Sequence, residues 1–310
     1  MYSTDDLQTL VDPAPSGTLP LSAIHEELRI FLDALLSDFP GSGSVSVYFT
    51  KRAQHEPAVR QDLLPLLVYE AVSQGGYSNA IPLAAFWALC LAASHLLDDA
   101  QDNGRFQCVN DGVMALGAAN VALAQLDTGE DALRDILDAV GRVVALGANA
   151  QSDELQYGRT WSKAGYFRNM MGKAAVIIAT GVWIGGRLAT DNGETLALLK
   201  EFGLVLGMAI QISDDCLDLA DDLANGACTL PVIEGLAMRE HPDYPALKKL
   251  MSQTPLPESD VQTVVDILKN MGAVDACHRM VKAYQVQATA VFNIVPGLKT
   301  YFADYVTPEF

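Results

Sequence analysis

Apolar residues recur at the spacing of a helix along most of the chain, beginning at Leu21. Long runs of Ala, Leu, Val and Met alternate with short groups of Gly, Pro, Asn and Asp, which are typical of turns between helices. No run of alternating β-branched residues competes with this pattern. The pattern predicts helices over residues 21–38, 57–73, 80–102, 111–126, 131–157, 162–188, 193–221, 229–238, 258–270 and 272–289.

Three segments, Ile81–Leu97, Ala174–Gly186 and Leu204–Ile212, are apolar around almost the whole helix. Because a helix without a polar face must be enclosed by others, these segments predict central helices ringed by amphipathic ones. The fold class expected is all-α, with a single domain over residues 21–310. The first 20 residues are rich in Pro, Ser, Thr and Asp, and we expect them to form a mobile N-terminal arm.

The composition and net charge of the chain exclude some classes of protein and partner. Half of the 310 residues are hydrophobic, which is ample for a sizeable core and excludes an intrinsically disordered chain. There are 38 acidic residues and 20 basic ones, giving a formal charge of −18. Such a charge repels phosphate backbones and anionic lipid headgroups, so we expect no nucleic-acid partner.

The apolar segment Ile81–Leu97 is slightly short for a bilayer span and runs directly into Asp98. We therefore expect a buried helix rather than a stable membrane span. The N-terminus lacks the basic and apolar regions of a signal peptide. The 5 cysteines form no close pair, which favours reduced thiols over a disulfide framework or a zinc site. Together these features predict a cytoplasmic location.

Two Asp-Asp-x-x-Asp motifs each follow a long apolar segment. Their aspartates are Asp98, Asp99 and Asp102 in the first motif and Asp214, Asp215 and Asp218 in the second. Residues i and i+4 lie about 40° apart around a helix, so the first and third aspartates of each motif share a face. Like charges at this spacing repel, and the C-terminal end of a helix disfavours anions. Each motif alone fits a solvated acidic helix end, but two copies favour a cation site. The next acidic pair, Asp221 and Asp222, is expected to begin a solvated loop.

Carboxylate oxygens suit Mg²⁺, which binds one or two carboxylates together with the phosphate oxygens of a substrate. Two motifs facing each other across a cavity would hold a small set of Mg²⁺ ions that bridge one diphosphate. These ions would neutralise the charge that grows on the diphosphate as it departs. This chemistry is mainly electrostatic and needs no strong general base. No glycine-rich phosphate loop or nucleophile–base pair stands out in the sequence.

The two motifs and several other segments resemble the helical trans-prenyl (polyprenyl) diphosphate synthases and the related class I terpenoid synthases. The further matching segments are Pro65-Leu-Leu-Val-Tyr-Glu-Ala, Asp153-Glu-Leu-Gln156, Gly172-Lys173-Ala174-Ala175, Gly207-Met-Ala-Ile-Gln211 and Thr229-Leu-Pro-Val-Ile. The resemblance implies an all-α bundle with a central apolar cavity, a homodimer, a prenyl diphosphate substrate and three Mg²⁺ ions that bridge the diphosphate.

The resemblance also implies roles for individual residues. Asp98, Asp102 and Asp214 would ligate Mg²⁺, with Asp99, Asp215 and Asp218 assisting. Lys173 and Gln211 would contact the diphosphate or the prenyl cation, and Arg105 is the one arginine of a shortened loop after the first motif. Ala93 and Ser94 would face the prenyl tail, and their small size favours a C15–C25 substrate. His95 lies near the site as a substrate contact or as a satisfied core histidine. The aromatic residues that could stabilise a cation, or simply pack in the core, are Phe86, Trp87, Tyr166, Phe167 and Trp183.

The sequence departs from chain-elongating members where they bind isopentenyl diphosphate. The basic segment that those members carry just before the position of Pro65 is replaced here by Gln61, Asp62 and Leu64. A buried second diphosphate without positive charge beside it is costly. Our leading hypothesis is therefore ionisation of one allylic diphosphate with cyclisation or elimination, as in a terpene synthase. The alternatives are a prenyltransferase, acting on isopentenyl diphosphate or on another acceptor such as an indole or peptide, and a non-catalytic subunit of a heteromeric synthase.

Overall fold

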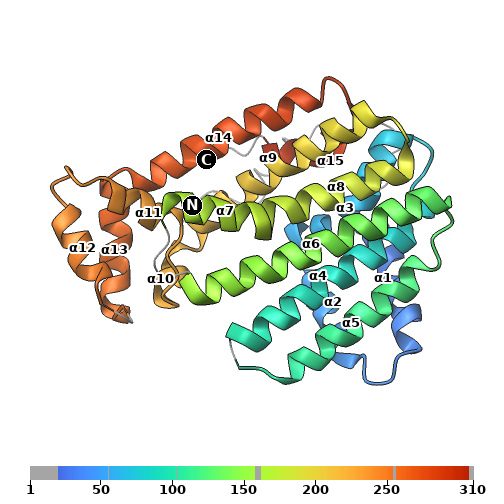
Figure 1. The fold of residues 1–310 in the computed structure, drawn as a ribbon, viewed down its shortest axis with the longest axis horizontal. Helices are drawn as coiled ribbons and strands as arrows, with labels where there is room; N and C mark the ends of the chain where they lie inside the picture. Colours follow the sequence, from blue (N-terminus) through green and yellow to red (C-terminus); the bar gives the residue numbers. More distant parts are fainter. Residues whose placement is uncertain (1–19, 55, 103, 158–161, 254–255, 307–310) are drawn as a thin grey trace, which may run out of the picture. The chain divides into compact units, whose positions relative to one another are not determined.

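The protein is described by a computed structural model that covers residues 20–54, 56–102, 104–157, 162–253 and 256–306. Within these ranges every regular element is a helix, which confirms the all-α fold class (Figure 1). The predicted N-terminal arm lies outside the described residues, apart from Pro20. The first helices are α1 (Leu21–Ser37), α2 (Gly43–Arg52), α3 (Glu56–Ser73), η1 (Ser78–Ala80), α4 (Ile81–Asp102), α5 (Gln107–Leu123) and α6 (Glu130–Tyr157). They are followed by α7 (Lys163–Met170), η2 (Met171–Ala175), α8 (Val176–Ala189), α9 (Gly193–Leu217), α10 (Leu219–Ala224), α11 (Leu230–Ala237), α12 (Tyr244–Met251), α13 (Glu258–Asn270), α14 (Ala273–Val291) and α15 (Gly297–Val306).

The chain divides into two compact units. Unit 1 comprises Met1–Leu63 and Ala84–Gln125, and unit 2 comprises Leu64–Leu83 and Leu126–Phe310. Unit 1 contains most of α4, which carries the first aspartate motif, and packs it closely against α5. A Cβ atom added at Gly112 of α5 would lie 3.0 Å from the Leu97 side chain and 3.2 Å from the Ala93 carbonyl oxygen. This tight contact holds the segment of α4 that leads into the motif.

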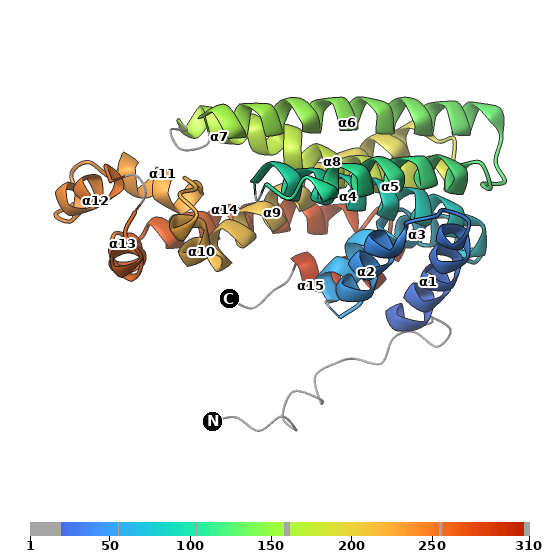
Figure 2. The ribbon, with the colours of Figure 1, turned by 90° about the horizontal axis from the view of Figure 1, so that it is seen from below.

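Unit 2 is built around α9, which carries the second motif and packs against α8 and α14. Glycines allow the backbones of α8 and α9 to approach each other. A Cβ atom at Gly203 would lie 2.4 Å from the Ala179 Cα atom, and one at Gly207 would lie 2.8 Å from the Ala175 Cα atom. Such distances exclude any side chain at these two positions without a backbone shift. Helices α10–α13 lie together at one end of this unit (Figure 2).

The predicted helix over residues 162–188 is interrupted in the structure. Residues Met171–Ala175 form one π-helical segment between α7 and α8. A π-helical turn inserts one extra residue into a helix and occurs frequently at functional sites. The predicted helix over residues 193–221 likewise divides at Asp218 into α9 and α10, so Asp221 and Asp222 lie in a helix rather than in the expected loop.

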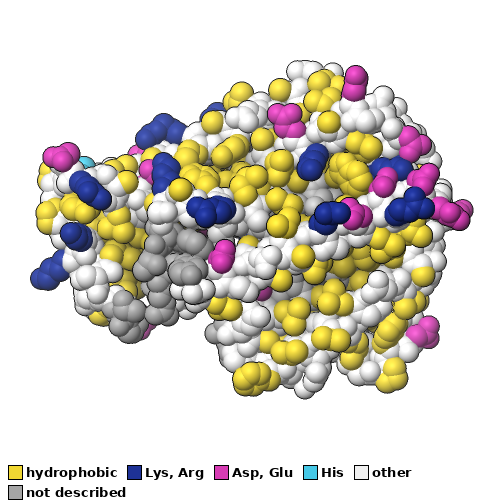
Figure 3. All heavy atoms as spheres, viewed as in Figure 1, with side chains coloured by type: hydrophobic (Ala, Val, Ile, Leu, Met, Phe, Trp, Pro, Cys, Tyr) yellow, Lys and Arg dark blue, Asp and Glu magenta, His cyan; other side chains and the backbone are white. Residues whose placement is uncertain are grey.

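Two helices are long and apolar enough to cross a membrane by length and composition. They cover Ser78–Gln101 and Gly193–Leu217. In the most apolar 18-residue stretch of each helix, 67% and 44% are buried inside the protein. The core helices of soluble proteins have the same length and composition. On the face drawn in Figure 3, the described Lys and Arg side chains are scattered, and several lie beside Asp or Glu side chains.

Candidate active site

The first aspartate motif lies in the last turns of α4. The Asp98 and Asp99 side chains are partly exposed. Asp99 accepts a 3.1 Å hydrogen bond from Arg105, but these two side chains are 40% and 65% exposed, so the ion pair contributes little stability. Asp102 is the last residue of α4, and its side chain lies outside the described part of the structure. Arg105 therefore lies beside the first motif, as a substrate-binding role would require.

One turn earlier on α4, Ala93 is buried and the Ser94 hydroxyl donates a 2.9 Å hydrogen bond to the Leu91 carbonyl oxygen. The Ser94 hydroxyl is thus engaged by its own helix. The prediction that these two small side chains face a prenyl tail stays a prediction.

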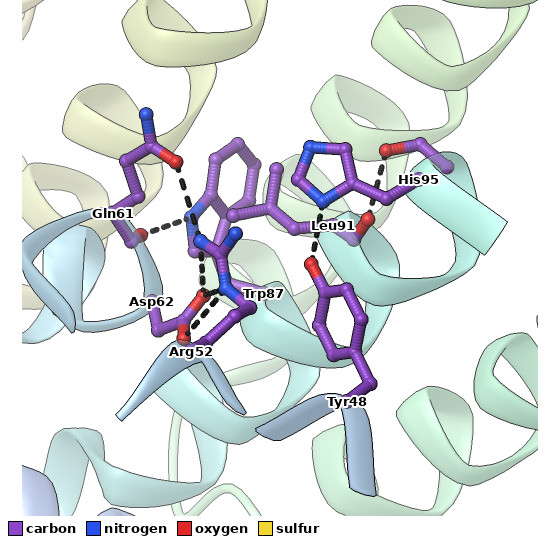
Figure 4. A network of polar contacts seen from close by, with 8 residues as sticks. Tyr48, Arg52, Gln61, Asp62, Trp87, Leu91 and His95 are labelled. Atoms are coloured by element: carbon purple, nitrogen blue, oxygen red, sulfur yellow. Dashed lines mark hydrogen bonds and ion pairs between the residues drawn. The ribbon is translucent and has the colours of Figure 1, made fainter. Parts of the chain in front are cut away.

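His95 differs from the core histidine considered as an alternative, because its side chain is exposed. Its Nδ1 atom lies 2.5 Å from the hydroxyl oxygen of Tyr48, which comes from α2 (Figure 4). Tyr48 in turn lies under the guanidinium of Arg52, whose Cζ atom is 5.4 Å from the centroid of the phenol ring. Neither Tyr48 nor Arg52 was identified from the sequence.

Arg52 forms a buried ion pair with Asp62 at 2.9 Å, and the Asp62 side chain is completely inaccessible to solvent. Arg52 also donates a hydrogen bond to Gln61 Oε1 at 3.2 Å, and the Trp87 indole N–H donates to the Gln61 carbonyl oxygen at 3.0 Å. Burial raises the pKa of Asp62 to about 6, although the Arg52 charge opposes this rise. Asp62, which stands where chain-elongating members carry a basic residue, therefore binds Arg52.

Asp215 in the second motif is buried and accepts three hydrogen bonds. The donors are the Tyr166 hydroxyl of α7 at 2.6 Å, the Gln211 side chain at 2.9 Å and the Leu230 backbone N–H of α11 at 3.0 Å. Burial raises the pKa of Asp215, while these three donors act in the opposite direction. Asp215 thus connects α7, α9 and α11. The side-chain amide of Gln211 donates its hydrogen bond to Asp215 in the structure.

Asp214 and Asp218 form the exposed edge of the second motif. Partial burial of its carboxyl group and the negative charges of Asp218 and Asp215 raise the pKa of Asp214 to about 6. Asp222 of α10 belongs to the same acidic region, because burial and the charges of Asp215 and Asp218 raise its pKa to about 7. Carboxyl groups that repel one another in this way favour a bound cation.

The donor set at this edge suits Mg²⁺, because hard carboxylate oxygens are the ligands that Mg²⁺ prefers. In the described part of the chain, no three His, Cys, Asp or Glu side chains lie close enough together to hold a metal ion. The first motif belongs to unit 1 and the second to unit 2. The joint metal site predicted from the sequence is therefore a proposal, argued below.

Lys173 lies in the π-helical segment η2 and is held by α6. Its Nζ atom donates hydrogen bonds to Gln151 Oε1 at 2.5 Å and to Glu154 Oε2 at 2.6 Å. The resemblance pointed instead to Asp153 and Gln156, whose side chains are exposed. The partners of Lys173 were missed because the helical face that α6 turns toward η2 cannot be read from a short motif.

Phe167 packs at the edge of the hydrophobic cluster in unit 2. Its ring meets the Tyr166 ring edge to face, with centroids 5.4 Å apart and an interplanar angle of 83°. This edge-to-face contact shows that Phe167 packs against Tyr166 and supports its ring. A contact between Phe167 and a prenyl cation stays a prediction.

The sequence is similar to a known protein family and to individual members of it. The polyprenyl synthetase family matches residues 59–268 of the chain. Octaprenyl diphosphate synthase of Haemophilus influenzae is 24% identical over 332 residues, which cover 96% of this chain and 92% of the relative. Heptaprenyl diphosphate synthase component 2 of Bacillus subtilis is 26% identical over 144 residues, 42% of this chain and 40% of the relative.

The fold is also found among solved structures. The crystal structure of a polyprenyl synthetase from Streptomyces coelicolor A3(2) superposes with a TM-score of 0.79 at 19% identity and covers 93% of this chain and 98% of its own. At this identity the similarity supports the fold alone. The family match spans more than half of the chain and includes both aspartate motifs. The chain belongs to the polyprenyl synthetase family and is an enzyme that acts on prenyl diphosphates.

Proposed function

We propose that the protein is a Mg²⁺-dependent prenyltransferase that ionises an allylic prenyl diphosphate and joins the prenyl group to an acceptor. The observation that carries this proposal is the crowding of Asp214, Asp218 and Asp222, where neighbouring charges help to raise the pKa values of Asp214 and Asp222. Bound Mg²⁺ would relieve the repulsion between these carboxylates, and a diphosphate would complete its oxygen ligands. Transfer is favoured over cyclisation because the curated relatives are named as prenyl diphosphate synthases.

In this proposal Asp98 and Asp102 of the first motif and Asp214 and Asp218 of the second motif are the residues that would hold Mg²⁺. When bound, Mg²⁺ would supply positive charge that neutralises the negative charge growing on the diphosphate leaving group. Asp99 assists at the first motif. The chain's own contribution is to hold the carboxylates at the ends of two rigid apolar helices and to exclude water from the cation.

Asp215 and Lys173 have supporting roles in the same proposal. Asp215 is an acceptor for three donors within the protein, so we assign it to positioning α9 rather than to direct metal contact. Lys173 supplies an ammonium group for the diphosphate, and Gln151 and Glu154 hold that group in place beforehand. A lysine fixed in this way loses less side-chain entropy when the substrate binds.

Cyclisation or elimination is the second candidate, and the Asp62–Arg52 ion pair is the observation that favours it. Chain elongation needs positive charge beside a second diphosphate, but Arg52 is already neutralised by Asp62 at 2.9 Å. An uncharged acceptor would need no such charge. The fate of the prenyl cation therefore depends on whether an acceptor binds.

Product analysis separates these outcomes. The protein is incubated with C10, C15, C20 or C25 allylic diphosphates and Mg²⁺, with and without isopentenyl diphosphate, and products are identified by mass spectrometry. A prenylated acceptor or a longer prenyl diphosphate supports the transferase. A hydrocarbon formed without an acceptor supports the second candidate. If no diphosphate is released from any substrate, or if Asp214→Asn releases it as fast as the wild type, the metal-dependent ionisation is wrong.

The assembly of the protein is part of the same proposal. We propose a catalytic homodimer, which sedimentation or light scattering would measure. The relative from Bacillus subtilis is named as component 2 of its synthase, so a heteromeric assembly is the alternative. Diphosphate release by the purified chain on its own would exclude the non-catalytic subunit considered from the sequence.

A further inference from the structure

We propose that Cys216 of α9 and Cys277 of α14 are a redox-sensitive pair, which a peroxide converts reversibly into a disulfide that displaces the second aspartate motif. All five cysteines are free thiols in the structure. The formation of the bond does not depend on the proposed function. Its effect on activity rests on that function, because it takes Asp214 as a ligand of the metal that binds the diphosphate.

The fold brings these two thiols together from distant parts of the sequence. Helices α9 and α14 pack side by side in unit 2 (Figure 1). Cys216 lies in the last turn of α9, and Cys277 lies in the first turns of α14. The Cys277 thiol donates a hydrogen bond to the Cys216 sulfur. Because the two sulfur atoms are already in contact, a bond between them needs only a local shift of the two helices.

The surroundings of Tyr166 place the pair beside the contacts of Asp215. Burial and the charge of Asp215 raise the pKa of Tyr166, and the Cys277 and Cys216 thiols add to this rise. Both sulfur atoms therefore lie near the hydroxyl that donates a 2.6 Å hydrogen bond to Asp215. Cys216 also follows Asp215 directly in the chain. A bond between the two thiols would thus form next to the side chain that positions α9.

The two thiols differ in exposure, which sets the order of the reaction. Cys216 is partly exposed, whereas Cys277 is completely buried in the hydrophobic cluster of unit 2. A peroxide therefore reaches Cys216 first, and Cys277 is the thiol that completes the disulfide. Cys228 lies in the same cluster, but among the described residues no second thiol affects its pKa, which burial alone raises to about 11. Cys228 is therefore the matched control.

The reaction balances with hydrogen peroxide as the oxidant. The Cys216 sulfur attacks one peroxide oxygen and the O–O bond breaks, which gives a sulfenic acid and, with the thiol proton, one water. The Cys277 sulfur then attacks the Cys216 sulfur, and the hydroxyl group leaves with the Cys277 proton as a second water. The two thiols lose two electrons in total, and these reduce the peroxide. A dithiol such as dithiothreitol reverses the bond by thiol–disulfide exchange.

The bond acts on the second motif because Cys216 lies within that motif. An S–S bond is about 2.0 Å long, which is shorter than the contact between two hydrogen-bonded sulfur atoms. Its formation therefore draws the last turn of α9 toward Cys277, which the core holds in place. Asp215 is fixed by hydrogen bonds from three donors, so this shift strains those bonds and moves the adjacent Asp214.

Thiol counting and peptide mapping test whether the bond forms. The reduced protein is treated with hydrogen peroxide, and free thiols are counted after unfolding in urea. We expect the wild type to lose two of its 5 thiols and Cys228→Ala to lose the same two. Cys216→Ala and Cys277→Ala should form no internal disulfide. Circular dichroism verifies the fold of each variant, and either of the last two removes the pair, so one folded variant is sufficient.

Trypsin cleavage without reductant locates the bond. The oxidised wild type should yield the peptide 201–239 joined to the peptide 270–279, and dithiothreitol should separate them. Cys228 lies on the same peptide as Cys216. The joined peptides should therefore persist in Cys228→Ala and be absent from Cys216→Ala, which assigns the bond to Cys216.

Kinetics test the effect on the second motif. Release of diphosphate from a C15 or C20 allylic diphosphate is measured before and after oxidation. We expect oxidation to lower kcat/KM about tenfold or more in the wild type and in Cys228→Ala, because a small displacement of catalytic groups has effects of this size. Dithiothreitol should restore both enzymes. The kcat/KM of Cys216→Ala should not change on the same treatment.

Two results would overturn the inference. If the wild type keeps all 5 thiols, or if the two peptides stay separate, Cys216 and Cys277 are not a redox-sensitive pair. If the disulfide forms but kcat/KM is unchanged, the bond does not control the second motif. Failure of the proposed function has a different signature, because the reduced wild type would then release no diphosphate while the peptide map would still show whether the bond forms.

Discussion

The Tyr166 hydroxyl of α7 donates a 2.6 Å hydrogen bond to the buried carboxyl group of Asp215, 49 residues away on α9. This bond joins the helix before the π-helical segment to the helix that carries the second aspartate motif. Because Asp215 also accepts from Leu230 N–H, three helices depend on one carboxyl group. The position of Asp214, the adjacent proposed metal ligand, depends on the same contact.

Removing the Tyr166 hydroxyl should destabilise the protein. In Tyr166→Phe, Asp215 loses one of three donors while the ring still packs, so we expect a loss of about 1–3 kcal/mol in the free energy of unfolding. Urea denaturation measures this loss, and Tyr244→Phe on α12 is the matched control. An unchanged unfolding midpoint for Tyr166→Phe would show that the hydrogen bond from Tyr166 to Asp215 does not stabilise the fold.

Asp62 should make stability depend on pH. Its pKa in the folded protein is raised to about 6, above the value in an unfolded chain, so the folded protein binds the proton more tightly. Its contribution to stability is therefore fully present at pH values below about 4 and is lost as the pH rises toward 6.

The effect is measured as the difference in free energy of unfolding between wild type and Asp62→Asn, because other titrating groups then largely cancel. We expect this difference to fall between pH 4 and 6, with a slope of at most about 1.4 kcal/mol per pH unit. A difference that grows with pH would mean that the attraction of Arg52 outweighs burial at Asp62.

The close approach at Gly185 should tolerate no side chain. A Cβ atom there would lie 2.2 Å from the Pro65 carbonyl oxygen of α3, and a backbone atom cannot rotate away. We expect Gly185→Ala to cost about 2 kcal/mol or more. Gly141→Ala on α6 is the control, because nothing lies within 4 Å of its Cβ position and alanine favours the helix by about 0.5–1 kcal/mol. Thermal unfolding should therefore shift in opposite directions for the two variants.

Asp222 should have opposite effects on the metal-free and the metal-bound protein. In Asp222→Asn, relief of repulsion from Asp215 and Asp218 should stabilise the metal-free protein at pH 8 by roughly 0.5 kcal/mol. The same change should weaken Mg²⁺ binding, measured as a smaller rise in the unfolding temperature on adding Mg²⁺ with diphosphate. Asp221→Asn, the exposed neighbour, is the control. An equal Mg²⁺ response in both variants would show that Asp222 does not belong to the proposed Mg²⁺ site.

Lys173 should matter more for substrate than for folding. We expect Lys173→Gln to lower kcat/KM for the allylic diphosphate by about tenfold to a hundredfold, because the ammonium group is lost. The amide retains a side-chain donor for Glu154, so unfolding should change little. Lys200→Gln, exposed on α9, makes the same chemical change away from the π-helical segment. Equal kinetics for the two variants would assign Lys173 to structure alone.

Much of the fold followed from the apolar pattern, because long helices such as α4 and α9 have strong and continuous apolar runs. Helix α2 was missed because only Val45 and Phe49 of its ten residues are buried and Ser, Thr and Lys fill much of the remainder. Helices α12 and α15 were missed because they are short, with 8 and 10 residues, and a proline lies at the start of each.

The sequence predicted the acidic residues of the candidate site but not the residues that hydrogen-bond to them. Asp214 and Asp218 are apparent from their spacing alone. Tyr166 and Leu230 reach Asp215 only after α7 and α11 pack beside α9, and no local pattern encodes such contacts. For Asp222 a signal was present, since it forms an acidic pair with Asp221, but the pair was assigned to a loop instead of to α10.

The π-helical segment Met171–Ala175 changes the rotational phase of the helices on either side of it. One additional residue turns everything downstream by about 100° relative to an uninterrupted α-helix. Tyr166 and Met170 before the segment and Ala175 and Ala179 after it can therefore all face inward. Deleting a single residue here would rotate α7 and its tyrosine away from α9, so insertions and deletions in this segment are constrained even where substitutions are tolerated.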